Sequence, residues 1–251
     1  MGGGVSFKEF EPAFGREKGV VWAADVEPHQ FARTMEQIGD VEGLVGIKLG
    51  FEVGLGLGLK EAVRIAKLNT NAVIQYDHQK AGNDIPDTSI NFVRAMVNAD
   101  VDSAILFPFT GPETQIAWTR ALKSEGINVF TGAEMTHKRF KKAEGGSIPE
   151  TSLNRIFDVA LDEGVDDFIV PGNKKSSVVK WRTKIERVLG VGCFALAAPG
   201  FVDQGGSITE AGAVAGEIWH PIIGRGVHEN KDGLSPREAV EFYVQQMRGE
   251  Q

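Results

Sequence analysis

The chain has 251 residues, of which 42% are hydrophobic, so it can bury a sizeable core in a single α/β domain. Its formal net charge of −7 at pH 7 argues against a general nucleic-acid binder, because neutralising phosphates requires a basic face. The sequence holds one cysteine, which excludes an internal disulfide framework and a cysteine-based metal site.

The first 19 residues predict a helical segment that packs on the main domain. Phe7, Phe10 and Phe14 recur at spacings of three and four, the pattern of one helical face, and we expect this face to cover the bottom of a core. The segment is too charged for a signal peptide, and no apolar run in the chain approaches the roughly 20 residues of a membrane span. We therefore expect a cytoplasmic protein that binds neither membranes nor nucleic acid.

From residue 20 onward, short apolar runs alternate with amphipathic stretches. The apolar runs predict strands at residues 20–24, 44–50, 72–77, 103–107, 128–133, 167–170, 193–198 and 219–224. The amphipathic stretches predict helices at residues 28–38, 59–69, 87–99, 111–125, 151–163, 174–189, 209–215 and 235–248. Ser235 is a predicted N-cap, with Pro236 at the first helical position, and the polar, basic stretch 138–149 predicts a loop.

Strands that alternate with helices pair in parallel, because each crossover returns the chain to the same end of the sheet. Eight such units predict a closed (β/α)8 TIM barrel that forms one catalytic domain over residues 20–251. An open, doubly wound sheet is the structural alternative.

The segment 71–88 is the most unusual part of the sequence. Its apolar start gives way to a run of acids and bases that includes Asp77, Lys80 and Asp84. In a parallel barrel the carboxyl ends of the strands form one rim, where active sites lie. Solvent exposure would account for any one charge at a strand end, but Lys48, Asp77 and Lys80 adjoin apolar runs around a narrow barrel. The other strand ends add further polar residues to this rim: Asp25, Thr136, His137 and Arg225.

The loops after the seventh and eighth strands predict a phosphate site. The stretch from Pro199 to Ser207 is glycine-containing and precedes a helix, and Gly224 and Arg225 follow the last strand. Glycines let backbone N–H groups approach an anion closely, a helix N-terminus favours negative charge, and arginine offers a forked cation. TIM barrels often bind phosphate at these two loops. The alternative is a plain turn, because glycine is abundant in this chain.

Taken in order, these pieces resemble the orotidine 5′-phosphate decarboxylase family over nearly the whole chain, from Val20 to His228. The matching stretches are Ala-Asp25, Ile-Lys48-Leu-Gly, the Asp/Lys/Asp-Ile-Pro set of residues 77–88, Glu-Met-Thr136-His, Pro199-Gly-Phe-Val-Asp-Gln204-Gly-Gly and Ile-Ile-Gly-Arg225-Gly. The family decarboxylates orotidine 5′-monophosphate to uridine 5′-monophosphate in pyrimidine biosynthesis without a metal or organic cofactor. The resemblance therefore implies a nucleotide substrate, no cofactor and a homodimer.

The resemblance also implies a role for each matching residue. Four residues would form a charged tetrad around the reacting carbon, with Lys80 as the proton donor: Lys48, Asp77, Lys80 and Asp84. The substrate would be held by Asp25, Lys48, Thr88, Thr136, Pro199, Gln204, Gly224 and Arg225. Of these contacts, the ribose would be met by Asp25 and Lys48, the pyrimidine edge by Thr136, and the phosphate by Gln204, Gly224 and Arg225. Asp84 and Thr88 would reach across the dimer interface to the neighbouring site.

The third strand departs from the family pattern. The family spaces its residues Asp-x-Lys-x-x-Asp, whereas this chain has Asp77-x-x-Lys80-x-x-x-Asp84, one residue longer in each gap. Residues i and i+2 of a strand share a face but i and i+3 do not, so we expect a bulge at 78–79 and a rearranged turn at 81–83. His78 is then a loop or supporting residue, or else a member of the site.

Two other functions remain open. Sugar-phosphate decarboxylases and aldolases on related barrels use a metal and, by resemblance, place an acid where Lys48 stands. A non-catalytic barrel that binds a phosphoribosyl ligand is the second alternative, and the longer third-strand spacing is its support. Cys193 lies in a predicted apolar strand, and we expect it to be a small core residue.

Overall fold

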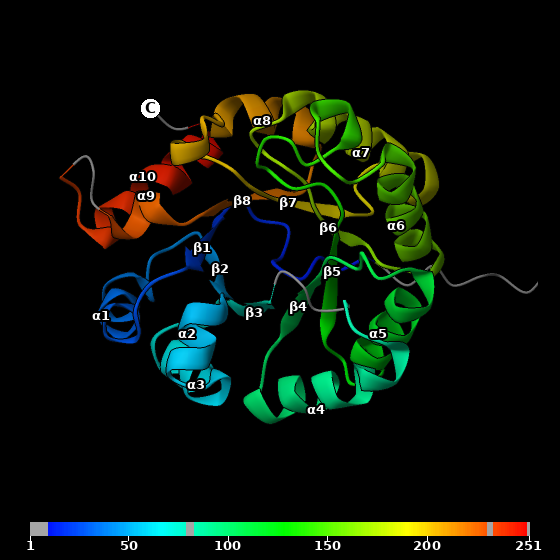
Figure 1. Cartoon of the computed structure of the whole chain (residues 1–251). Helices are drawn as coiled ribbons and strands as arrows, with labels where there is room; N and C mark the ends of the chain where they lie inside the picture. Colours follow the sequence, from blue (N-terminus) through cyan, green and yellow to red (C-terminus); the bar gives the residue numbers. More distant parts are fainter. Residues whose placement is uncertain (1–9, 79–82, 230–232, 250–251) are drawn as a thin grey trace, which may run out of the picture.

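The computed structural model describes residues 10–78, 83–229 and 233–249, apart from the side chain of Asp203. Within them the chain forms a closed barrel of parallel strands in sequence order, ringed by helices (Figure 1). The strands are β1 (Val20–Ala24), β2 (Leu44–Leu49), β3 (Val73–Asp77), β4 (Ser103–Leu106), β5 (Asn128–Gly132), β6 (Asp167–Ile169), β7 (Ala195–Pro199) and β8 (Trp219–Ile223). The predicted (β/α)8 barrel is confirmed, and the open-sheet alternative is excluded, because β1 pairs with β8.

The helices match the predicted amphipathic stretches closely. They are α1 (Pro28–Ile38), α2 (Phe51–Gly56), α3 (Leu59–Asn69), α4 (Ser89–Ala99), α5 (Pro112–Ser124), α6 (Glu150–Asp162), α7 (Lys175–Leu189), α8 (Ile208–Ala215), α9 (Arg225–His228) and α10 (Pro236–Arg248). Two short helices, α2 and α9, were not expected. The predicted start of α10 is confirmed by a capping box, in which Ser235 and Glu238 satisfy each other's backbone N–H groups. No helix among the described residues is long and apolar enough to cross a membrane.

The strand register stacks the inward side chains in layers of four, drawn from alternate strands. The lowest layer holds Gly46, Ser103, Asp167 and His220. The second holds Val21, Gln75, Phe130 and Ala197. The third holds Lys48, Ile105, Ile169 and Ile222, and the uppermost holds Ala23, Asp77, Gly132 and Pro199. The functional rim is therefore reached only by the upper two layers.

Residues 10–19 close the lower end of the barrel as turns and bends, and the helix predicted for the N-terminal segment is absent from this part of it. Phe14 is buried and inserts where Gly46 has no side chain, with its ring centroid 5.0 Å from that of Phe130. A regular helix would not deliver this single ring into the barrel axis. Phe14 thus fills the lower end of the barrel interior.

The lowest layer is polar for a barrel interior. Asp167 and His220 are buried, and within the part of the chain that the structure describes neither the Oδ1 of Asp167 nor the Nε2 of His220 has a hydrogen-bond partner. Burial raises the pKa of Asp167 well above its usual value and lowers the pKa of His220. Both side chains are therefore favoured in their uncharged forms.

The prediction that Cys193 is a core residue is wrong. Cys193 is exposed, because β7 begins two residues later, at Ala195, and the cysteine belongs to the turn before it.

Candidate functional site

A cavity of about 340 Å³ opens at the carboxyl ends of the strands, a size suited to a small-molecule ligand. The upper two interior layers, apart from Gly132, form its floor. Eight of the predicted site residues line it: Asp25, Lys48, Asp77, Thr136, Pro199, Gln204, Gly224 and Arg225. They come from six strand ends that are far apart in sequence, so the barrel brings this predicted set together; their chemical roles stay predictions.

The floor of the cavity carries a buried ion pair. The Nζ of Lys48 lies 2.7 Å from the Oδ2 of Asp77, and the two side chains are 8% and 2% exposed. The same Nζ lies 3.7 Å from the Oδ2 of Asp25, which is half exposed at the rim. Burial alone would lower the pKa of Lys48, but Asp77 and Asp25 outweigh it and hold the pKa above its usual value. Lys48 is thus a fixed cation inside the cavity.

Local sequence explains why these three groups meet. Lys48 and Asp77 are inward positions of the neighbouring strands β2 and β3, and each ends an apolar run. Gly50 lies just after β2, and a Cβ at this position would come 2.3 Å from the Oδ1 of Asp25. The glycine therefore leaves room for the carboxylate beside Lys48.

The opposite side of the cavity is formed by the loops after β7 and β8. Arg225 begins α9, and Gly224 immediately precedes it. Gln204 lies in a loop that is folded back on itself, since the N–H of Gly206 donates to the carbonyl of Gly200 at 3.2 Å. An arginine, backbone glycines and an amide side chain on one wall are a combination that can bind a phosphate.

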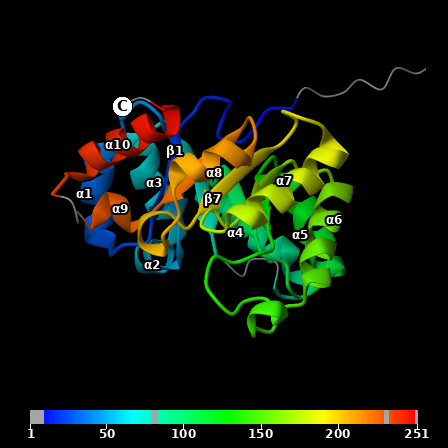
Figure 2. The same ribbon diagram turned by 90° about the horizontal axis from the view of Figure 1, so that it is seen from above.

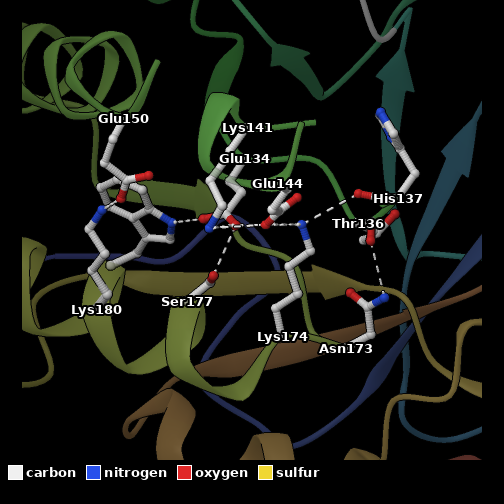
Figure 3. Close-up of polar contacts among 11 residues, drawn as sticks. Glu134, Thr136, His137, Lys141, Glu144, Glu150, Asn173, Lys174, Ser177 and Lys180 are labelled. Carbon is white, nitrogen blue, oxygen red and sulfur yellow. Dashed lines mark hydrogen bonds and ion pairs between the residues drawn. The ribbon is translucent and has the colours of Figure 1, made fainter. Parts of the chain in front are cut away.

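The end of β5 forms a third wall. Glu134, Met135 and Thr136 line the cavity in succession. The amide of Asn173 donates to the carbonyl of Thr136 at 3.2 Å, which fixes the backbone there (Figure 3).

Three of the predicted positions that the structure describes are not brought into this cavity. The carboxylate of Asp84 accepts a hydrogen bond from the N–H of Ile85 at 2.7 Å, and the hydroxyl of Thr88 donates to the carbonyl of Ile85 at 2.8 Å. His78 is exposed and its Nδ1 lies 2.6 Å from the hydroxyl of Tyr76, on the outer side of β3. Lys80 lies outside the described residues, as do residue 79 of the predicted bulge and residues 81–82 of the predicted turn.

The cavity also contains residues that were not predicted. Phe107 follows β4, Glu134 lies two residues after β5, and His228 and Glu229 follow Arg225. The indole N–H of Trp22 donates to the Nδ1 of His228 at 3.3 Å. His228 stands three residues after Arg225, a helical spacing that could have indicated it had the short helix α9 been predicted.

Residues 18–243 match the model of the orotidine 5′-phosphate decarboxylase / HUMPS family. The chain belongs to this family. The resemblance inferred from the sequence is thereby confirmed, and the chain is an enzyme of a family whose named relatives are carboxy-lyases.

Individual relatives agree with the family assignment. The orotidine 5′-phosphate decarboxylase of Methanosarcina barkeri is 27% identical, over 92% of this chain and 95% of that protein. The Methanosphaera stadtmanae enzyme of the same name is 25% identical, over 91% of this chain and 97% of that protein.

Solved structures share the fold. The orotidine 5′-monophosphate decarboxylase of Methanocaldococcus jannaschii, complexed with the inhibitor BMP, has a TM-score of 0.77 at 21% identity, covering 91% of this chain and 98% of that one. The Pyrococcus horikoshii enzyme has a TM-score of 0.72 at 24% identity, covering 92% of this chain and all of that one. At this level of identity the structures establish the fold alone.

Proposed function

We propose that this protein decarboxylates orotidine 5′-monophosphate to uridine 5′-monophosphate and CO2 in de novo pyrimidine biosynthesis, without a metal or organic cofactor. The observation that carries the proposal is the buried ion pair of Lys48 and Asp77, on the floor of a cavity whose other wall holds Gln204 and Arg225. This arrangement offers charges to a reacting carbon and, across the cavity, an anchor for a phosphate.

The reaction needs electrostatic help because the leaving CO2 leaves its bonding electron pair on a ring carbon that has no electron sink. Lys80 would stabilise this negative charge and then donate a proton to the carbon. Asp77 would face the substrate carboxylate, and Lys48 would keep Asp77 ionised and in place. Enzymes lower reaction barriers by roughly 8–23 kcal/mol in total, and in the proposed reaction most of this would come from the charged groups of the cavity.

Substrate binding would use the remaining walls. Asp25 and Lys48 would contact the ribose, and Thr136 would bond the pyrimidine edge. The phosphate would be held by Gln204, Gly224 and Arg225, with Pro199 as a further substrate contact. Binding energy from the phosphate would then be used to hold the base against the charged floor.

We further propose a homodimer in the cytoplasm, in which Asp84 and Thr88 serve the neighbouring site. Both residues lie outside their own chain's cavity and next to the exposed side chain of Ile85. Other exposed apolar side chains follow β2 and β4 at the same rim, namely Phe51, Leu55 and Phe109. Such side chains are typical of a surface that a partner covers.

The metal-dependent sugar-phosphate reaction is the main rival. Lys48 disfavours it, because a lysine ammonium occupies the place beside Asp77 where those enzymes, by resemblance, have an acid. Among the described residues, no group of three or more His, Cys, Asp or Glu side chains is placed to hold a metal ion. The non-catalytic alternative is supported only by the longer spacing in the third strand.

One assay separates the three functions. Purified protein is mixed with orotidine 5′-monophosphate, and the loss of its absorbance is followed with and without a chelator. We expect chelator-insensitive turnover that Lys80→Ala abolishes while binding of uridine 5′-monophosphate remains measurable. Arg225→Ala should weaken the nucleotide far more than phosphate-free orotidine. Absence of turnover in the wild-type protein, or full activity of Lys80→Ala, would contradict the proposal.

A further inference from the structure

Glu134 is a buried carboxylate in the cavity wall that the proposed reaction does not use. Its side chain is 1% exposed, and four groups surround it. The hydroxyl of Ser177 donates to Oε1 at 2.9 Å, and the indole N–H of Trp181 donates to Oε2 at 2.8 Å. The Nζ of Lys141 lies 2.8 Å from Oε1, and that of Lys174 lies 3.6 Å from the same atom.

The donors come from two parts of the chain that flank the cavity. Ser177, Trp181 and Lys174 belong to α7 or its N-cap. Lys141 belongs to the excursion, residues 137–149, which joins β5 to α6 and projects at the end of the barrel opposite residues 10–19 (Figure 2). Figure 3 shows Glu134, Lys141 and Lys174 converging, with Glu144 of the excursion beside both lysines.

These ion pairs close the excursion onto the barrel. Lys141 and Lys174 lie 3.4 and 3.6 Å from the Oε1 of Glu144. The Nζ of Lys174 also lies 3.4 Å from the carbonyl of His137, the first residue of the excursion. Phe140 packs edge-on against Phe109 of the neighbouring loop, at 5.9 Å between ring centroids. The excursion is therefore held by charge on one side and by an aromatic contact on the other.

Thr136 stands between the two anchored points. It is two residues after Glu134 and immediately before the excursion, and its carbonyl is held by Asn173. A change in the position of Glu134 or of the excursion must move Thr136, because the backbone between them is only a few residues long.

We propose that Lys141, through its ion pair with Glu134, is a positioning residue that sets the place of Thr136 and the charge of the cavity wall beside the bound base. The inference rests on the proposed function, since it names what orients the base in that reaction. Lys141 itself does not line the cavity and acts only through Glu134.

The charge balance around Glu134 gives the proposal a distinctive signature. Burial alone would raise the pKa of Glu134, but Lys141, Trp181 and Ser177 outweigh it and hold the pKa below its usual value. The other charged groups that face this site are Glu144 from the excursion, Lys174 at the N-cap of α7 and Lys180 from α7. Without Lys141 the burial effect gains weight, so Glu134 would take up its proton at a higher pH.

The test compares Lys141→Met with Lys141→Arg and with Lys142→Met. Lys142 is the adjacent, exposed lysine of the same excursion and makes no ion pair with Glu134, so it is a matched control. Backbone hydrogen exchange of residues 137–149 reports directly on the anchoring. The affinity for uridine 5′-monophosphate and the pH profiles of kcat and KM for orotidine 5′-monophosphate report on the cavity.

In Lys141→Met we expect faster exchange confined to residues 137–149 and a KM about tenfold to a hundredfold higher, with a smaller change in kcat, since small misplacements of positioning groups have effects of this size. The acid limb of the profile should move to higher pH. Lys141→Arg should restore all three properties, and Lys142→Met should match the wild type.

Equal exchange and equal KM in Lys141→Met and Lys142→Met would overturn the inference. If Lys141→Met does not fold, Lys174→Met removes the more distant cation, and unchanged exchange and KM there would count against the inference in the same way. A wild-type protein without turnover would instead contradict the proposed function. Hydrogen exchange in the variants would still decide whether Lys141 anchors the excursion.

Discussion

Replacing Lys48 by methionine tests the central electrostatic feature of the cavity. The substitution keeps an unbranched apolar stem of similar length and removes only the ammonium group. The carboxylate of Asp77 would stay buried, at 2% exposure, but it would lose the Lys48 ammonium that lies 2.7 Å from it. Removing one partner of a buried ion pair costs roughly 3–5 kcal/mol, because the remaining charge stays desolvated.

The measurement is urea and thermal unfolding of the wild type and of Lys48→Met. For a chain of this length, about 1 kcal/mol corresponds to roughly 2–4 °C, so the midpoint should fall by roughly 6–20 °C. Lys60→Met is the matched control, since Lys60 is exposed on α3 and surface charges contribute at most about 1 kcal/mol.

A double-mutant cycle identifies the cause. Lys48→Met/Asp77→Asn removes the leftover charge together with its partner, so this variant should regain most of the lost stability. The reasoning is refuted if Lys48→Met is as stable as Lys60→Met, or if adding Asp77→Asn deepens the loss.

Two further predictions concern the lower end of the barrel. Phe14→Ala should lower the free energy of unfolding in urea by about 3–5 kcal/mol, because it empties the space that Gly46 leaves inside the barrel. An unchanged unfolding midpoint would show that the Phe14 ring does not contribute to stability. Asp167→Asn should stabilise the protein by about 1–3 kcal/mol at pH 7. The pKa of Asp167 is raised in the folded state, so its ionisation opposes folding as pH rises above about 3.8. The gain should therefore vanish in acid, and a gain that is the same at every pH would contradict this cause.

The sequence alone was enough to predict the (β/α)8 barrel and the rim at which most of the predicted site residues meet. Apolar runs that alternate with amphipathic stretches predict strands that alternate with helices, and such strands pair in parallel. Parallel pairing puts the carboxyl end of every strand on one side of the barrel. Lys48, Asp77 and Arg225 could therefore be placed together although they are far apart in the chain. Their shared cavity follows from topology, which local patterns encode.

Other features depend on contacts that no local pattern encodes. The phenylalanine spacing of the N-terminal segment predicted a helix, but Phe14 is drawn into the barrel by the space above Gly46, a residue more than 30 positions away. Cys193 has the apolar neighbours of a strand, yet the register of β7 with β6 leaves it in the preceding turn.

The same limit applies to Glu134 and its lysines. The stretch 138–149 looked like a solvated basic loop, and only the contact of α7 with Glu134, which follows β5, reveals that Lys141 and Lys174 meet a buried carboxylate. Sequence determines which residues follow a strand, because that depends on short-range order. Tertiary structure decides which of them are desolvated and paired, because burial and charge pairing depend on side chains brought together from distant parts of the chain.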